Sequence, residues 1–139
     1  MKLKNNMKAI RHFGIVVSDM EKSLEFYRDI LGLKIKVDAL EEGEFIDAIL
    51  GMQKVKVRTV KMAADEGNSL VELLFYHSRP KGASHTAFTV ENLDNEYKRL
   101  KDKGVKFISE PQLSPNGKAK VAFCYDPDGV PVELVEQII

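Results

Sequence analysis

Residues 12–32 read HFGIVVSDMEKSLEFYRDILG, and this stretch begins a pattern that returns in the second half of the chain. HFGIVV is the second part of KAIRHFGIVV, residues 8–17, which is rich in β-branched residues and therefore predicted to be a strand. Ser18 and Glu21 then have the spacing of a capping box, and Gly32 is a typical helix end. Between them an apolar stripe recurs at helical spacing, formed by Met20, Leu24, Tyr27 and Leu31. The stretch therefore predicts a strand followed by one amphipathic helix.

A second copy of the pattern begins at His85. Residues 85–104 read HTAFTVENLDNEYKRLKDKG, again a strand and then a helix with a glycine at its end. When His12 is aligned with His85, Asp19 meets Asn92, and LVELL of residues 70–74 later meets PVELV of residues 131–135. A repeat of this kind indicates two similar units, each too small to bury a sheet face alone. We expect their sheets to close around a shared cleft.

The remaining segments complete the two units. Alternating or apolar runs predict strands at residues 33–40, 54–62, 70–76, 105–111, 117–125 and 131–138. A short helix is expected to end at Gly51, and residues 77–84 read as a turn-rich connector. Residues 1–6 are interpreted as a frayed leader without the apolar region of a signal peptide.

Composition excludes some partners. Lysines and arginines number 21, as do aspartates and glutamates, so the formal net charge of zero gives no support for nucleic acid or an anionic membrane as partner. No apolar run is long enough to span a bilayer. The single cysteine, Cys124, permits no internal disulfide, which fits a reducing cytoplasm. We therefore expect a cytoplasmic protein that acts on a small molecule.

Each half carries one histidine early in its first strand and one glutamate early in its last strand. The set is His12, Glu72, His85 and Glu133. Strict alternation places each of them between apolar or small residues on its face: Ile10 and Gly14 flank His12, and Pro131 and Val135 flank Glu133. Taken singly, each histidine or glutamate is more simply explained as a core or edge residue. Their recurrence at matching places of a repeat favours one shared site instead.

A divalent cation explains this set well. Buried carboxylates without partners are costly, and two of them in one cleft repel each other. A cation neutralises the pair and accepts the lone pairs of the imidazoles. Two nitrogen and two oxygen ligands suit zinc, nickel, cobalt, manganese or iron(II), and an octahedral ion would keep two positions for water or substrate.

Other polar residues have simpler interpretations. Glu136 lies on the opposite face from Glu133, and His77 belongs to the polar connector. Cys124 is expected to be a buried small residue rather than a nucleophile. The lysines of residues 54–61 are interpreted as a solvated strand face, while a weaker alternative uses Arg58, Lys118 and Lys120 to bind a substrate carboxylate or phosphate.

The motifs HFGIVVSDMEKSLEFYRDILGL, VELLFY, SHTAFTVENLD and DPDGVPVELVE together resemble the vicinal oxygen chelate superfamily. This superfamily contains glyoxalase I, methylmalonyl-CoA epimerase, extradiol dioxygenases and the fosfomycin- and bleomycin-resistance proteins. The resemblance implies an α+β fold in which two tandem βαβββ modules, residues 7–77 and 83–139 of a single domain 7–139, form a partly closed, barrel-like cleft. It also implies a divalent metal ion on His12, Glu72, His85 and Glu133, and a homodimer.

The ligand set favours one branch of that family. His-Glu-His-Glu resembles glyoxalase I, whereas the epimerases usually carry glutamine where this chain has Glu72. We therefore predict a metal-dependent lyase or isomerase for a substrate with two adjacent oxygens, such as a thiol hemithioacetal, with Glu72 or Glu133 as the proton shuttle. The alternatives are a CoA-ester epimerase, a non-catalytic resistance-type binding protein, and a relative of the extradiol dioxygenases or thiol transferases.

Overall fold

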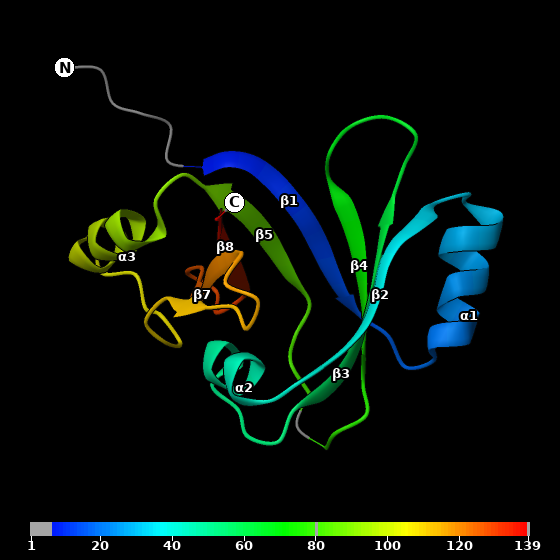
Figure 1. The fold of residues 1–139 in the computed structure, drawn as a ribbon, viewed down its shortest axis with the longest axis horizontal. Helices are drawn as coiled ribbons and strands as arrows, with labels where there is room; N and C mark the ends of the chain where they lie inside the picture. The colour runs from blue at the N-terminus through cyan, green and yellow to red at the C-terminus, as the bar shows by residue number, and fades with distance from the viewer. Residues whose placement is uncertain (1–6, 80, 139) are drawn as a thin grey trace.

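The computed structural model describes residues 7–79 and 81–138, and it divides the chain into two similar halves (Figure 1). The predicted leader, residues 1–6, lies outside the described residues. The elements of the first half are β1 (Met7–Val16), α1 (Met20–Leu24), η1 (Glu25–Ile30), β2 (Lys34–Glu42), α2 (Glu44–Leu50), β3 (Lys56–Ala63) and β4 (Leu70–Tyr76). Those of the second half are β5 (His85–Val90), α3 (Leu93–Asp102), β6 (Gln112–Leu113), β7 (Ala119–Tyr125) and β8 (Pro131–Gln137).

All the strands of the described chain belong to one mixed sheet, in the order β2-β3-β4-β1-β5-β8-β7-β6. The first strand of each half pairs in parallel with the last strand of that half, β1 with β4 and β5 with β8. β1 and β5 pair antiparallel and join the two halves. The sheet curls into a half-barrel (Figure 1). The predicted α+β fold of two repeated modules is confirmed.

The helices divide between the two faces of the sheet. On one face, Met20 and Leu24 of α1 pack on Val60, Met62 and Leu73. On the same face of the other half, Leu93 of α3 packs in a cluster with Val90, Ala122, Cys124 and Leu134. The opposite, concave face receives α2, whose Ile46 and Ile49 pack with residues of both halves, namely Val57, Leu74, Val121, Phe123 and Val135. The concave face is therefore closed by one short helix, which leaves a cleft. No helix of the described residues is long and apolar enough to cross a membrane.

The start and end of the first helix differ from expectation. Asp19, not Ser18, is the N-cap, and its carboxylate accepts a hydrogen bond from the Lys22 amide at 3.0 Å. After Leu24 the helix widens into the π-helical turns of η1. Wider turns rotate the later residues away from the apolar stripe. Leu31 is consequently 54 % exposed, so the prediction that it joins the stripe was wrong.

The strand predicted at residues 105–111 was also wrong. Phe107 forms only an isolated bridge with Cys124, and the edge strand β6 follows at Gln112. Phe107 packs against the cluster beneath α3, whereas Ile108 packs against the cleft cluster. The apolar alternation therefore reflects packing on two sides of a connecting segment, and Pro111 lacks the amide that a continued strand would need.

Candidate metal centre

The strand register brings the four predicted residues together. Glu72 lies opposite Gly14, and Gly14 lies opposite His85. In the next row His12 lies opposite Ala87, and Ala87 lies opposite Glu133. Each row thus places a very small residue between two functional side chains. A Cβ on Gly14 would overlap the His85 ring, so this small residue leaves room for an imidazole.

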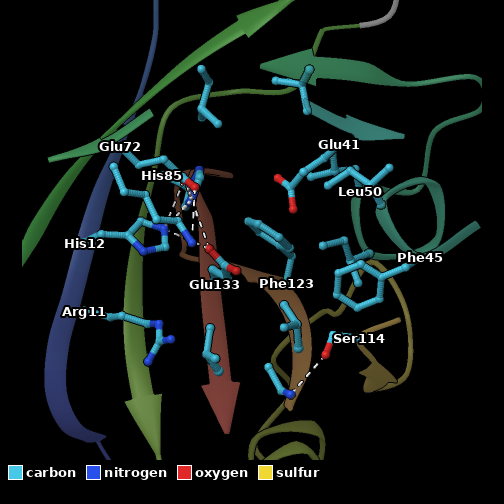
Figure 2. A pocket seen from close by; sticks show the side chains of 18 of the residues that line it. Arg11, His12, Glu41, Phe45, Leu50, Glu72, His85, Ser114, Phe123 and Glu133 are labelled. Carbon is cyan, nitrogen blue, oxygen red and sulfur yellow. Dashed lines mark hydrogen bonds and ion pairs between the residues drawn. The ribbon is translucent and has the colours of Figure 1, made fainter. Parts of the chain in front are cut away.

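The ligand atoms of His12, Glu72, His85 and Glu133 all lie within 4.8 Å of one another (Figure 2). Nε2 of His12 is 3.0 Å from Oε1 of Glu133 and 3.2 Å from Oε1 of Glu72. Nε2 of His85 is 3.1 Å from the same Glu133 oxygen and 3.5 Å from that of Glu72. The two Nε2 atoms are 3.1 Å apart. His12 and Glu72 are buried, and the side chains of His85 and Glu133 are 6 % and 13 % exposed.

These spacings fit a divalent cation. Metal–ligand bonds of about 2.1 Å separate adjacent ligands by about 3.0 Å in an octahedron and about 3.4 Å in a tetrahedron. The separations given above, 3.0–3.5 Å, are close to these two values. Without a metal ion, hydrogen bonds alone satisfy these polar atoms poorly, because the two Nε2 atoms compete for the same two carboxylate oxygens. The four side chains could therefore hold a metal ion.

The Nδ1 atoms of the two histidines have different surroundings. Nδ1 of His85 lies 3.4 Å from the Ala83 carbonyl oxygen and can donate a hydrogen bond to it. That tautomer leaves Nε2 as a lone-pair donor facing the cluster, as metal ligation requires. Nδ1 of His12 is buried without a hydrogen-bond partner among the described residues. Ligation of a metal through Nε2 would place the ring proton on this Nδ1 atom.

Without a metal, the cluster holds protons tightly. Burial lowers the pKa of His12, but hydrogen bonds to Glu133 and Glu72 outweigh it and raise that pKa to about 9. The pKa of His85 is also raised, since the attraction of Glu133 exceeds the effect of burial. For Glu133 burial raises the pKa, yet the two histidines lower it well below its usual range. A cation would replace the positive charge that the imidazolium groups otherwise supply.

The cluster lies in a cavity of about 330 Å³ between the sheet and α2. The wall formed by α2 contributes Phe45, Ile46, Ile49 and Leu50. Lys61 also lines the cavity, with Nζ 3.9 Å from Oε2 of Glu72, so its assignment to a solvated lysine face was wrong. Lys61 shares the cleft-facing side of β3 with Val57 and Thr59, whereas Lys56 is exposed.

A third carboxylate, that of Glu41, faces the cluster from across the cavity (Figure 2). Burial and the negative charge of Glu72 raise its pKa. The sequence analysis missed this residue. The available signal was the same as for Glu133, since Glu41 follows Val37 and Ala39 on one side of an alternating strand.

A β-bulge changes which residues of β1 lie on the same face as His12. The register between β1 and β5 shifts between Ile10 and His12, so Arg11 is the extra residue. Arg11 and His12 consequently both line the cavity, while Ile10 is 48 % exposed. The prediction that Ile10 shares the face of His12 was wrong, because strict alternation fails at a bulge.

Most other polar candidates lie outside the cavity. Cys124 is buried, and burial raises the pKa of its thiol, which agrees with a structural role. His77 is exposed and stacks edge-on against Phe75. Arg58 pairs with Asp38 at 2.8 Å, and Lys120 pairs with Asp94 at 2.8 Å. Lys118 alone of the alternative anion-binding set lines the cavity.

Glu136 is on the opposite face from Glu133, as predicted. Its Oε1 accepts a hydrogen bond from the Leu93 amide at 2.8 Å, at the start of α3. Its function there is to stabilise the helix start.

Comparisons with known proteins place the chain in a family. Residues 9–134 match the family described as the Glyoxalase/Bleomycin resistance protein/Dioxygenase superfamily. The chain is 33% identical over 131 residues to a probable lactoylglutathione lyase of Synechocystis, covering 90% of this chain and 92% of that protein. It is 29% identical to a probable chloroplastic lactoylglutathione lyase of Arabidopsis thaliana but spans only 37% of that longer protein.

Solved structures agree on the fold. A methylmalonyl-CoA epimerase from Mycobacterium tuberculosis superposes with a TM-score of 0.76 at 22% identity, covering 99% of this chain and 93% of that one. A Streptomyces coelicolor methylmalonyl-CoA epimerase superposes with a TM-score of 0.69 at 24% identity, covering 94% of this chain and 95% of that one. With the repeated modules and the sequence match over nearly the whole chain, the protein belongs to the glyoxalase/bleomycin resistance protein/dioxygenase superfamily.

Proposed function

We propose that this protein is a metal-dependent isomerase or lyase that moves a proton between adjacent carbons of a small carbonyl substrate, as lactoylglutathione lyase does. The observation that carries the proposal is the converging cluster of His12, Glu72, His85 and Glu133 on the floor of a cavity. The likeness to proteins named lactoylglutathione lyase supports the same chemistry.

The four cluster residues would hold the metal ion. When bound, a divalent ion supplies Lewis acidity toward two adjacent substrate oxygens. Side chains of the protein hold the oxygen-bearing end of the substrate, and they accept and return its proton. The apolar wall of α2 excludes water from the reacting carbons, which strengthens electrostatic interactions in the cavity.

Glu72 and Glu133 are the two candidates for the proton shuttle. Glu133 touches both histidines, with Oε1 3.0 Å from Nε2 of His12 and 3.1 Å from Nε2 of His85. Glu72 has one oxygen toward the histidines and the other 3.9 Å from Nζ of Lys61. Either carboxylate can accept the proton from one substrate carbon and return it to the next.

A second candidate function is epimerisation of a thioester, and Glu41 is the observation that favours it. Epimerisation removes a proton from one face of a carbon and adds another to the opposite face, so it benefits from two acid–base groups on opposite sides. Glu41 faces Glu133 from across the cavity, and burial together with the negative charge of Glu72 raises its pKa (Figure 2).

One experiment separates the two functions. Wild type and Glu41→Gln are loaded with metal and assayed on the methylglyoxal–glutathione adduct and on methylmalonyl-CoA in deuterated water. The lyase proposal expects adduct turnover, while epimerase activity would appear as deuterium exchange in the thioester that is lost in Glu41→Gln. Glu42→Gln is the matched control, because Glu42 is exposed on the other side of the same strand. Absence of turnover on the adduct, with rapid exchange in the thioester, would replace the first function by the second.

Domain organisation and assembly belong to the same proposal. We expect one domain of residues 7–139, a small-molecule substrate, a cytoplasmic location and a homodimer. Exposed apolar side chains at the end of η1 and on the edge strand β2 support self-association, among them Ile30, its C-cap residue Leu31, Val37 and Leu40. Unpaired sheet edges are usually covered by another element or chain.

A further inference from the structure

Two glycines, Gly14 and Gly82, are explained by close contacts rather than by backbone conformation. The other glycines of the chain adopt positive φ, which glycine tolerates best, whereas these two do not. A Cβ on Gly14 would overlap the ring of His85, a residue of the metal centre. A Cβ on Gly82 would overlap the hydroxyl group of Tyr76. The second contact lies in the connector between the two modules and has no role in the account given so far.

Tyr76 is the last residue of β4, and it lines the cavity together with Glu72 and Leu74 of the same strand. The residue is only 6 % exposed. Burial raises the pKa of Tyr76 to about 12, although a hydrogen bond from the Gly82 backbone partly offsets this effect. The buried phenol therefore stays neutral, and its polar end is satisfied by the backbone of the connector.

The chain passes the end of β1 on its way from Tyr76 to His85, because β1 lies between β4 and β5 in the sheet. At this crossing the Val16 amide donates a hydrogen bond to Oγ of Ser84 at 3.1 Å. This bond ties the residue before β5 to the end of β1. The hydrogen bond between Tyr76 and Gly82 ties the same stretch to the end of β4.

Ala83 lies between the two tied residues, and its carbonyl oxygen is 3.4 Å from Nδ1 of His85. A hydrogen bond to this oxygen selects the tautomer of His85 that leaves a lone pair on Nε2. Because Gly82 and Ser84 are both held, the carbonyl group between them has little freedom to turn. Phe123 packs edge-on against the His85 ring, with 5.2 Å between ring centroids, but it offers no hydrogen-bond acceptor.

We propose that Tyr76 is a positioning residue for the metal centre: by holding Gly82, it fixes the Ala83 carbonyl group that orients the His85 imidazole toward the ion. The inference rests on the proposed function in taking His85 as a metal ligand. It makes the connector part of the metal site, because a side chain of the first module sets the orientation of a ligand from the second.

Zinc affinity and the ring proton of His85 test the proposal without requiring turnover. Affinity is measured by competition with a chelator. Long-range nitrogen–proton NMR of the zinc-loaded protein reports which nitrogen of His85 carries the proton and how fast that proton exchanges with water. The variants are Tyr76→Phe, which deletes the hydroxyl group but keeps the buried ring, and Gly82→Ala, which places a methyl group against the hydroxyl. Tyr97→Phe is the matched control, because the Tyr97 hydroxyl accepts a hydrogen bond from Lys101 outside the cavity.

We expect the His85 proton of wild type on Nδ1 and in slow exchange with water. Tyr76→Phe should accelerate this exchange and weaken zinc binding by about tenfold, the lower end of the loss when a hydrogen bond behind a metal ligand is removed. Gly82→Ala should have a similar effect. The double variant should lose less than the two single losses combined, because the hydroxyl group that the methyl group would overlap is absent. Tyr97→Phe should behave like wild type.

The proposal is overturned by unchanged zinc affinity in both Tyr76→Phe and Gly82→Ala, by strictly additive losses in the double variant, or by equal losses in Tyr76→Phe and Tyr97→Phe. Weaker zinc binding with unchanged exchange of the His85 proton would also overturn it, since a general loss of stability would then be the cause. If Tyr76→Phe fails to fold, Gly82→Ala decides the matter, because it acts on the same contact from the connector.

Failure of the proposed function has a different signature. His85→Ala would bind zinc as tightly as wild type if the proposed metal centre were wrong. If only the proposed reaction were wrong, zinc binding would depend on Tyr76 while neither the adduct nor the thioester is turned over.

Discussion

The His85 ring occupies the space that a side chain on Gly14 would fill, since the two residues face each other across β1 and β5. Gly14→Ala should therefore displace His85 from the cluster. We expect the free energy of unfolding to fall by about 1–3 kcal/mol, as in overpacked cores, and metal affinity to fall with it. Thermal unfolding and a metal titration measure the two effects. Phe13→Ala, a change on the exposed side of the same strand, should leave metal affinity unaltered. Normal metal affinity in Gly14→Ala would show that His85 is not a ligand.

The metal centre itself predicts a loss of bound metal when half of it is removed. The double variant His85→Ala, Glu133→Ala keeps one imidazole and one carboxylate, too few to retain a divalent ion through purification. Elemental analysis of the purified proteins is the measurement. His77→Ala is the histidine control, because His77 is exposed outside the cluster. Equal metal content in wild type and the double variant would contradict the proposed ligand set.

The pKa of His12 predicts how stability depends on pH in metal-free protein. Because its folded pKa of about 9 exceeds the ordinary histidine value of 6.5, the bound proton stabilises the fold fully below pH 6.5. That contribution is lost as pH rises from 6.5 to 9, and its size is on the order of 3 kcal/mol. Urea unfolding of chelator-treated protein at several pH values measures the decline.

Added metal should show the opposite trend. Ligand imidazoles must release their protons before they bind a cation, so stabilisation by metal should increase between pH 6.5 and 9. The measurement is the shift of Tm by a fixed metal concentration at each pH. A shift that is constant across this range would indicate that metal binds away from His12.

Glutamine variants at the two cluster glutamates identify the shuttle. Glu72→Gln and Glu133→Gln each keep an oxygen ligand but remove the base, so metal should largely remain. Turnover and proton exchange in deuterated water should fall by roughly two or more orders of magnitude in the variant that lacks the shuttle, and much less in the other. If both variants stay metal-loaded and exchange protons at the wild-type rate, neither glutamate is the base.

Self-association is expected at micromolar concentration. The exposed apolar groups on η1 and β2 would be covered in a homodimer. Sedimentation should then detect a species of twice the 15.7 kDa chain mass. Ile30→Lys, a change at a residue that is 74 % exposed, should favour the monomer without altering the fold. A single 15.7 kDa species in wild type would contradict the homodimer.

Local sequence determined much of this protein. The repeat around His12 and His85 predicted two equivalent modules, because each module alone has too little surface to bury its sheet. Glu133 was recognisable as a candidate metal ligand by its place between Pro131 and Val135, where a lone carboxylate would be costly. The short helix ending at Gly51 also agrees with the structure, since that glycine adopts a left-handed conformation.

Only the tertiary structure decided which side chains share the cavity. Alternation assigned Ile10 to the face of His12, but the bulge put Arg11 there, and a bulge depends on pairing with β5 far along the chain. In the sequence, Glu41 and Lys61 cannot be distinguished from the other charged residues of β2 and β3. Only the curvature of the sheet turns these two side chains toward the cavity that contains the cluster. Sequence periodicity reports the local side of a strand, whereas strand pairing and sheet curvature, set by contacts between distant residues, determine what that side faces.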